Sequence, residues 1–326
     1  MSAVGPIDAV LDCSLIGYTS IGYRIRRRTW QSDELARMDG RVVLITGATS
    51  GIGLAAAEGF ARLGASVRLL VRQAQRGERA RAQIIARSGN EDVGLELCDL
   101  SDLAAVRSFA QRFGAQAPRL DVLVNNAGVL TERRTLSVDG LELTLATNVI
   151  GPFLLTKMLT GLLERSAPSR VINVSSGGMY TQRLHLEDLQ MTGEHFRGSV
   201  AYARSKRIEV ILTELFAQRL EGSGVVVHAM HPGWVDTPGL AASLPRFHRL
   251  MRPLLRTPEQ GADTILWLGS AAQPARSSGG FWHDRRRRPT ARLRSSRESA
   301  GQRRQLWIEC ERLSAGGSDP SPLRRS

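Results

Sequence analysis

The 326-residue sequence contains few cysteines and no long uninterrupted apolar run. Its three cysteines, Cys13, Cys98 and Cys310, lie far apart and form no CxxC pair, which argues against a disulfide framework and against a zinc site. Apolar runs such as residues 42–45 are far shorter than the roughly 20 residues that span a bilayer, so no transmembrane helix is predicted. We therefore expect a reduced protein with incidental thiols and no metal site.

The start of the chain lacks the pattern of a secretory signal. Such a signal has a positive start followed by an apolar stretch, and here Asp8 and Asp12 interrupt that stretch. Export is therefore not expected, and the predicted location is cytoplasmic.

Lysine is nearly absent. Among 44 basic residues only Lys157 and Lys206 are lysines, so arginine supplies almost every positive charge. Lysine is a compact cation with rotatable donors and an accessible pKa, so its use at position 206, four residues after Tyr202, invites a chemical reason. Lys157, on a predicted helix, is equally explained by chance.

The formal net charge of +13 is concentrated near the C-terminus. Residues 276–326 contain 13 arginines against five acids, including the run Arg285 to Arg288, whereas residues 41–275 are only mildly basic. Residues 284–326 are therefore expected to form a solvated basic tail, with contact to a phosphate-bearing partner as the alternative. No nucleic-acid partner is expected.

From Arg41 onward, apolar β-type runs alternate with helical patterns. Strands separated by crossover helices form a parallel sheet covered on both faces, so the pattern predicts a doubly wound parallel sheet in a Rossmann-like, three-layer α/β/α fold. The predicted strands are 42–46, 66–71, 93–97, 121–125, 170–175 and 225–230. The predicted helices are 52–63, 74–87, 103–113, 140–163, 200–220 and one that starts near Pro258.

This Rossmann-type domain is predicted over residues 41–283. Within it, residues 234–256 mix apolar side chains with arginines after the last predicted strand, a position that favours a lid. Residues 1–40 form an N-terminal extension in which Arg24 to Arg28 lie among Tyr18, Ile21 and Trp30. Two interpretations of the extension stay open: peripheral contact with a membrane surface, or a packed N-terminal helix.

A glycine-rich turn, TGATSGIG at residues 46–53, joins the first predicted strand to a helix. Gly47 permits the tight turn, Gly51 lets the backbone approach a pyrophosphate, and Gly53 lets helix and strand pack closely. The positive N-terminus of the helix faces the anion. Because a strand precedes the motif and a helix follows it, the turn predicts dinucleotide binding rather than a turn without a ligand.

The second predicted strand ends in Arg72-Gln73, without the acid that an NAD-preferring site offers to the ribose hydroxyls. An arginine there pairs with a 2′-phosphate, so Arg72 favours NADP(H) over NAD(H) unless it is merely a surface residue. After the third strand, Asp99 is placed to meet the adenine edge or to cap the helix that begins near Asp102.

The ordered set of motifs resembles the short-chain dehydrogenase/reductase family over residues 41–282. The spacing from Ser176 to Tyr202 is similar to that of its retinol-dehydrogenase-like branch. Residues 244–250 and 281–285 resemble the subgroup called dehydrogenase/reductase member twelve, which does not supply a substrate. The motifs that carry the resemblance are residues 46–53, Asn125 to Gly128, Asn148, Ser176, Tyr202 to Lys206 and His231-Pro232-Gly233.

The resemblance implies a role for each catalytic residue. Tyr202 is the general acid/base, and Lys206 stabilises its anion and holds the nicotinamide ribose. Ser176 hydrogen-bonds the substrate oxygen, with Ser175 as the open alternative, and Asn148 supports a water-borne proton relay. Tyrosine, with an unperturbed pKa of about 10, is a poor base at neutral pH, and a lysine four residues along the same helix face counters this.

The residues expected to bind the cofactor lie at the carboxyl ends of the strands and on the catalytic helix. They are Thr46, Gly47, Ser50, Gly51, Ile52, Gly53, Arg72, Asp99, Leu100, Asn126, Ala127, Gly128, Tyr202, Lys206, Pro232, Gly233, Val235 and Thr237.

These features predict an NADP(H)-dependent oxidoreductase that interconverts a carbonyl and an alcohol. The apolar residues of 234–256 favour a lipophilic small molecule as substrate. The alternative is a dinucleotide-sensing regulator without turnover, which would not need Ser176, Tyr202 and Lys206 together. By analogy with the family, helices 140–163 and 200–220 are expected to pair in a homo-oligomer.

Overall fold

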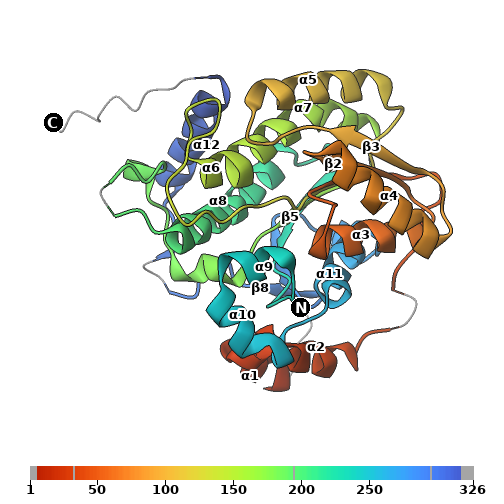
Figure 1. The fold of residues 1–326 in the computed structure, drawn as a ribbon, viewed down its shortest axis with the longest axis horizontal. Helices are drawn as coiled ribbons and strands as arrows, with labels where there is room; N and C mark the ends of the chain where they lie inside the picture. Colours follow the sequence, from red (N-terminus) through yellow and green to blue (C-terminus); the bar gives the residue numbers. More distant parts are fainter. Residues whose placement is uncertain (1–5, 32–33, 194, 294–295, 317–326) are drawn as a thin grey trace.

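The computed structural model describes residues 6–31, 34–193, 195–293 and 296–316. The outer ends of the expected N-terminal extension and C-terminal tail lie outside these residues. A central sheet lies between two layers of helices (Figure 1). This is the three-layer α/β/α fold predicted from the alternation of strands and helices.

The sheet has eight strands in the order β3-β2-β1-β4-β5-β6-β7-β8. β1 to β7 run parallel, and β8 pairs antiparallel with β7. The strand order reverses between β1 and β4, which opens a crevice at the carboxyl ends of these strands. The strands are Val42–Thr46 (β1), Ser66–Val71 (β2), Val93–Leu97 (β3), Val122–Asn125 (β4), Ser169–Val174 (β5), Val225–Met230 (β6), Gly280–His283 (β7) and Arg286–Arg288 (β8).

Both faces of the sheet are apolar, which is why helices cover both. In β1, Val43 and Ile45 belong to one core cluster and Leu44 to the other, because successive side chains point to opposite faces. One face carries Gly51–Arg62 (α3), Ala74–Ser88 (α4) and Pro258–Ser270 (α11); the other carries Leu103–Gln116 (α5), Gly151–Arg165 (α7) and Gly198–Arg219 (α8).

The helix predicted over residues 140–163 is interrupted. Leu143–Leu145 (α6) leads into a π-helical turn, Ala146–Ile150 (η2), before α7 begins at Gly151. A Cβ at Gly151 would lie 2.1 Å from the Leu100 carbonyl oxygen, so the helix approaches the end of β3 closely here. The π turn contains Asn148, and such turns are frequent at functional sites.

Short helices cover the carboxyl edge of the sheet. Residues 234–256, the expected lid, contain Pro238–Ser243 (α9), Pro245–Met251 (α10) and Arg252–Leu254 (η5). Further short helical turns are Gly177–Thr181 (η3), Leu186–Asp188 (η4) and Pro274–Arg276 (η6).

The N-terminal segment, residues 6–31, packs on the domain. It contains Pro6–Cys13 (α1), Leu15–Tyr18 (η1) and Ser20–Arg27 (α2), and Tyr18 stacks on Trp234 of the loop after β6 with ring centroids 5.6 Å apart. Arg26 is buried and pairs with Asp8 at 2.7 Å and with Asp284 at 2.8 Å. The inner side of this segment is therefore packed on the domain, as in the second interpretation, and its outer side is exposed.

The expectation of a solvated basic tail is wrong for residues 284–293 and 296–314. Strand β8 extends the sheet, and Arg288 is buried against Asp8 at 2.8 Å. The helix Ala300–Ser314 (α12) buries Leu306 and Trp307 against α7 and α8. The prediction failed because Arg285 and Arg288 form largely buried ion pairs and because Leu306 and Trp307 face the domain.

Helix α12 also covers part of the surface through which a homo-oligomer was expected to form. The Trp307 ring centroid lies 4.9 Å from those of Phe153 on α7 and Phe216 on α8. At the edge of this contact, Lys157 pairs with Glu311 at 2.5 Å. The chain's own helix therefore occupies surface of the two helices that were expected to pair between subunits.

One helical stretch, Leu143–Arg165, is long and apolar enough to cross a membrane by length and composition. However, 72% of its apolar window is buried inside the protein, where it packs between α5 and α8. It is therefore accounted for as a core helix of the domain.

Candidate active site

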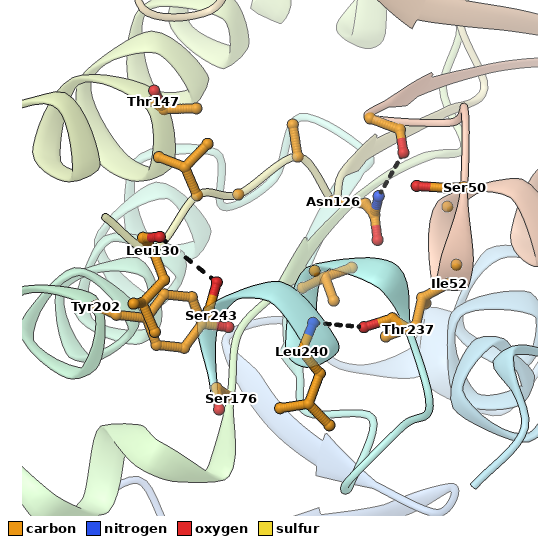
Figure 2. A pocket seen from close by; sticks show the side chains of 18 of the residues that line it. Ser50, Ile52, Asn126, Leu130, Thr147, Ser176, Tyr202, Thr237, Leu240 and Ser243 are labelled. Carbon is orange, nitrogen blue, oxygen red and sulfur yellow. Dashed lines mark hydrogen bonds between the residues drawn. The ribbon is translucent and has the colours of Figure 1, made fainter. Parts of the chain in front are cut away.

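A cavity of about 680 Å³ lies at the carboxyl edge of the sheet. Figure 2 shows Ser50 and Ile52 of the glycine turn on one side of it, and Ser176 and Tyr202 on the other. The structure brings nearly all predicted site residues to this cavity: Gly47, Ser50, Gly51, Ile52, Gly53, Arg72, Asp99, Leu100, Asn126, Ala127, Gly128, Ser175, Ser176, Tyr202, Lys206, Pro232, Gly233, Val235 and Thr237.

The glycine turn leaves bare backbone facing the cavity. Gly47 and Gly51 have positive φ angles of 66° and 54°, which L side chains rarely adopt. A Cβ at Gly53 would lie 2.4 Å from the Gly47 carbonyl oxygen and from Asn126 Nδ2, so only glycine fits. Ser50 precedes α3 without a side-chain cap, so the first N–H groups of α3 are available to an anion.

Thr46 does not reach the cavity, contrary to the prediction that it binds the cofactor. Its side chain is fully buried, and its Oγ1 accepts hydrogen bonds from the backbone N–H groups of Asn126 and Ala127, both at 2.9 Å. Asn126 in turn donates from Nδ2 to the Thr46 carbonyl oxygen at 3.0 Å. Thr46 thus joins the ends of β1 and β4 beneath the cavity floor.

Asn148 is also buried and does not line the cavity; its neighbour Thr147 does. Its Oδ1 accepts from the Val129 N–H at 2.8 Å, and its Nδ2 donates to the Val129 carbonyl oxygen and to Ser205 Oγ. The Asn148 side chain therefore holds the loop after β4 against α8, and only its backbone in the π turn is left for a proton relay.

The two candidate serines have different surroundings. Ser175 is buried, and its hydroxyl donates to the Lys206 carbonyl oxygen at 2.8 Å. Ser176 is half-buried, and its Oγ accepts from the Gly178 N–H at 3.1 Å. Within the described residues, the Ser176 hydroxyl donates to no protein group, whereas that of Ser175 does.

Tyr202 and Lys206 lie on one face of α8. Lys206 Nζ is 5.4 Å from the Tyr202 ring centroid and donates to the Val174 carbonyl oxygen at 2.9 Å. It also pairs with Glu209 Oε1 at 2.7 Å. Burial by itself would lower the pKa of Lys206, but the charge of Glu209 and the Tyr202 phenol raise it above the ordinary value, so Lys206 is a cation.

The end of β2 carries the expected arginine. Arg72 is largely exposed, lines the cavity, and has its Nε 4.0 Å from Asp99 Oδ2. Arg76, one turn into α4, lines the same part of the cavity. Asp99 does not cap α5: its Oδ1 accepts from Ser101, and Asp102 is the residue that caps the helix.

The opposite end of the cavity is apolar. Leu240 and Leu244 of the 234–256 segment line it together with Phe247 and Trp234. Ser243 Oγ donates to the Leu130 carbonyl oxygen at 3.5 Å, which places the segment against the loop after β4 (Figure 2). The cavity is therefore lined both by the polar backbone of the glycine turn and by aliphatic and aromatic side chains.

Sequence reasoning missed Arg76, Phe247 and Glu209. Arg76 follows Arg72 by four residues and lies in the first turn of α4, so a second arginine close to the end of β2 was the available signal. Glu209 stands between Ile208 and Val210 and three residues after Lys206, so an acid in an apolar stretch was the available signal. Phe247 belongs to the predicted lid, but nothing in the sequence distinguishes its orientation.

His231, next to the predicted Pro232-Gly233, is buried behind the cavity and stacks on His283 with ring centroids 3.8 Å apart. Burial and the neighbouring His283 hold the pKa of His231 well below its usual value, so the ring is neutral. Within the described part of the chain, no three His, Cys, Asp or Glu side chains converge to hold a metal ion.

Comparisons with known proteins agree with this geometry. The family model for short chain dehydrogenase matches residues 41–246. Dehydrogenase/reductase SDR family member 12 from Bos taurus is 43% identical over 275 residues, which cover 84% of this chain and 86% of that protein. Retinol dehydrogenase 11 from Mus musculus is 38% identical over 239 residues, covering 71% and 73%.

Solved structures show the same fold. An uncharacterized protein from Mycobacterium paratuberculosis has a TM-score of 0.70 and 30% identity, covering 88% of this chain and 97% of its own. The RhlG/NADP active-site complex from Pseudomonas aeruginosa has a TM-score of 0.63 and 27% identity, covering 77% and 96%. With its strand order, glycine turn and Tyr202–Lys206 pair, this chain belongs to the short-chain dehydrogenase/reductase family of oxidoreductases.

Proposed function

We propose that this protein is an NADP(H)-dependent oxidoreductase that interconverts a carbonyl and an alcohol on a lipophilic substrate, with Tyr202 as general acid/base. The observation that carries the proposal is one cavity that joins the glycine turn to Ser176, Tyr202 and Lys206. A regulator that only senses a dinucleotide would need the glycine turn but not these three side chains.

The residues present fit a dinucleotide. The bare backbone at Gly47 and Gly51 and the uncapped start of α3 suit a pyrophosphate. Arg72 and Arg76 suit a 2′-phosphate, and the end of β2 carries no acid to repel it. The RhlG structure named above is an NADP complex. When bound, the cofactor supplies or accepts the hydride.

The chain's own residues handle the proton. The Tyr202 hydroxyl donates a proton to the substrate oxygen in reduction and withdraws it in oxidation. The Ser176 hydroxyl hydrogen-bonds the same oxygen and orients it. The Lys206 ammonium, buried beside the Tyr202 ring, stabilises negative charge on the phenol oxygen.

A lipophilic substrate follows from the apolar end of the cavity. Burial of apolar surface contributes roughly 25 cal/mol per Å², so side chains such as Leu240, Leu244 and Phe247 favour an aliphatic or ring-bearing ligand. Retinol dehydrogenase 11, the relative described above, is named for such an alcohol.

The test is to titrate the protein with NADPH and NADH by nicotinamide fluorescence, and then to follow cofactor oxidation with a panel of lipophilic aldehydes and ketones. Tyr202→Phe should retain NADPH binding and lose turnover, whereas Tyr180→Phe, outside the cavity, should retain both. Binding without turnover of any panel member would favour the sensor, and no binding of either nucleotide would refute the proposal.

We further propose that the N-terminal segment contacts a membrane surface from the cytoplasmic side. Val10, Leu15, Ile16 and Ile21 are exposed on α1, η1 and α2 near exposed arginines, a pattern that suits anionic lipid. Leu15→Ser with Ile16→Ser should reduce co-sedimentation with phosphatidylserine vesicles. Val138→Ser, which alters an exposed valine outside the N-terminal segment, should not, and equal binding of all variants would refute the contact.

A further inference from the structure

Glu209 places a buried carboxylate on the catalytic lysine. It lies three residues after Lys206 on α8, and its Oε1 is 2.7 Å from Lys206 Nζ. The two side chains are only 10% and 3% exposed. Within the described residues, Glu209 Oε2 is buried and has no hydrogen-bond partner. A carboxylate in this position is costly to bury, and it has no second cation to offset that cost.

The charged groups around the pair are few. Lys206 is the charged group that lowers the pKa of Glu209. Glu209 and Tyr202 are the groups whose charges raise the pKa of Lys206. From the facing strand β5, Asn173 donates to Thr213 Oγ1, and the Thr213 hydroxyl donates to the Glu209 carbonyl oxygen. These neighbours are neutral, so the field at Tyr202 depends on the balance between Lys206 and Glu209.

Burial raises the pKa of Glu209 to about 7, and Lys206 limits that rise. The carboxyl is therefore ionised at the alkaline pH at which tyrosine titrates. An ionised Glu209 cancels part of the positive field through which Lys206 stabilises the tyrosinate.

We propose that Glu209 is a positioning residue: by offsetting the charge of Lys206, it keeps Tyr202 in the phenol form up to a higher pH. In reduction the Tyr202 O–H bond breaks and its proton goes to the carbonyl oxygen, while the carbonyl carbon accepts hydride from the reduced dinucleotide. In oxidation the tyrosinate takes the hydroxyl proton as hydride leaves the carbon. This inference rests on the proposed function for the role of Tyr202.

The test follows tyrosinate ultraviolet absorbance from roughly pH 6 to 10 in the free protein, with the signal of Tyr202→Phe subtracted. The chain has four tyrosines. Burial raises the pKa of Tyr23 to about 12 and also raises those of Tyr18 and Tyr180, so these three stay protonated in that range. The difference signal therefore reports Tyr202.

Glu209→Gln should lower the midpoint of this signal by about one pH unit. Glu214→Gln is the matched control. It removes a carboxylate from the same helix, but this carboxylate pairs with Arg303 and not with Lys206. Its midpoint should equal that of the wild type. An unchanged midpoint in Glu209→Gln, or an equal shift in Glu214→Gln, would overturn the proposal.

Glu209→Asp covers the case in which Glu209→Gln does not fold. Aspartate keeps the charge at a greater distance from Lys206, so its midpoint should lie below that of the wild type by a smaller amount. Binding of NADPH reports whether each variant is folded. If Glu209→Gln does not bind NADPH, a midpoint of Glu209→Asp equal to or above that of the wild type would overturn the proposal.

The titration needs no substrate, so it is independent of turnover. If wild-type protein oxidises no NADPH with any carbonyl, the proposed function fails, while the position of the midpoint still decides the role of Glu209. In an active protein, kcat/KM for alcohol oxidation should rise with pH as the tyrosinate forms. Glu209→Gln should move this acid-side limb to lower pH, and Glu214→Gln should not.

Discussion

Arg256 and Asp284 form a two-pronged ion pair inside the protein, with Nη1–Oδ1 at 2.6 Å and Nη2–Oδ2 at 2.8 Å. Both side chains are almost completely buried. Arg256 also donates to the carbonyl oxygens of Gly17 and Pro232. A single side chain thus joins the N-terminal segment, the turn after β7 and the loop that borders the cofactor end of the cavity.

Removing the negative charge of Asp284 should destabilise the fold. Asp284→Asn leaves Arg256 without its counter-charge in the interior, a change that costs about 3–5 kcal/mol. Urea unfolding followed by circular dichroism measures the loss. Asp39→Asn removes one partner of the exposed Arg37–Asp39 pair and should produce no measurable change. Equal midpoints for Asp284→Asn and wild type would show that the buried pair does not support the fold.

Stability should fall at acid pH because the buried carboxylates of Asp8 and Asp284 then lose their charge. Burial opposes the charge of Asp8, but Arg288 and Arg26 lower its pKa from 3.8 to about 2, and His283 and Arg256 lower that of the buried Asp284 further. A depressed folded-state pKa contributes stability above the unfolded value, and that contribution is lost as pH falls through the folded one. Urea midpoints should therefore drop between about pH 4 and 2. Asp8→Asn should have a shallower drop than wild type, and an equal slope would contradict this assignment.

Arg72 and Arg76 should determine the preference for NADPH. Replacing both by alanine removes charge-assisted hydrogen bonds to the 2′-phosphate, so the Kd for NADPH should rise about tenfold to a hundredfold, with little change for NADH. Fluorescence titration measures both. Arg79→Ala removes an exposed arginine of α4 that does not line the cavity and serves as the control. A parallel loss of NADH affinity would mean that the arginines act on some other part of the cofactor.

Ser176 should have a chemical role and Ser175 a structural one. Ser176→Ala should lower kcat about a hundredfold, because it removes a donor to the substrate oxygen, and should cost about 1 kcal/mol of stability through loss of the bond from the Gly178 N–H. Ser175→Ala should cost about 1 kcal/mol of stability by removing the bond to the Lys206 carbonyl oxygen. Measuring both quantities for both variants decides the matter, and the reverse pattern would make Ser175 the substrate-binding serine.

Helix α12 should be part of the cooperative fold. Leu306 is fully buried against α7 and α8, so Leu306→Ala should cost about 2–5 kcal/mol. Ile308, two residues along the same helix, is 54% exposed, and Ile308→Ala should leave the urea midpoint nearly unchanged. Equal small effects would mean that α12 unfolds independently of the domain.

Local patterns were enough for much of the fold and of the site. The alternation of apolar runs and helices from Arg41 onward predicts the first six strands to within a residue or so of the observed ends. The glycines at 47, 51 and 53 predict the turn because their backbone requirements are local. Tyr202 and Lys206 share a helix face by their spacing alone.

The remaining features depended on which groups meet across the sheet. Thr46 and Asn148 were assigned to the site from motif position, but contacts with residues about 80 and 19 positions away turn their side chains into supports. The C-terminal arginines suggested a solvated tail, yet burial beside Asp8 and Asp263 makes them part of the fold.

The sequence by itself therefore determined the order of elements, the glycine turn and the Tyr202–Lys206 pair, since each follows from dihedral preference or helical periodicity within a few residues. Only the tertiary structure decided which serine hydroxyl is bonded to the protein, which arginines are buried and which helix covers α7 and α8. Burial and charge pairing are properties of long-range contacts, and no local pattern specifies them.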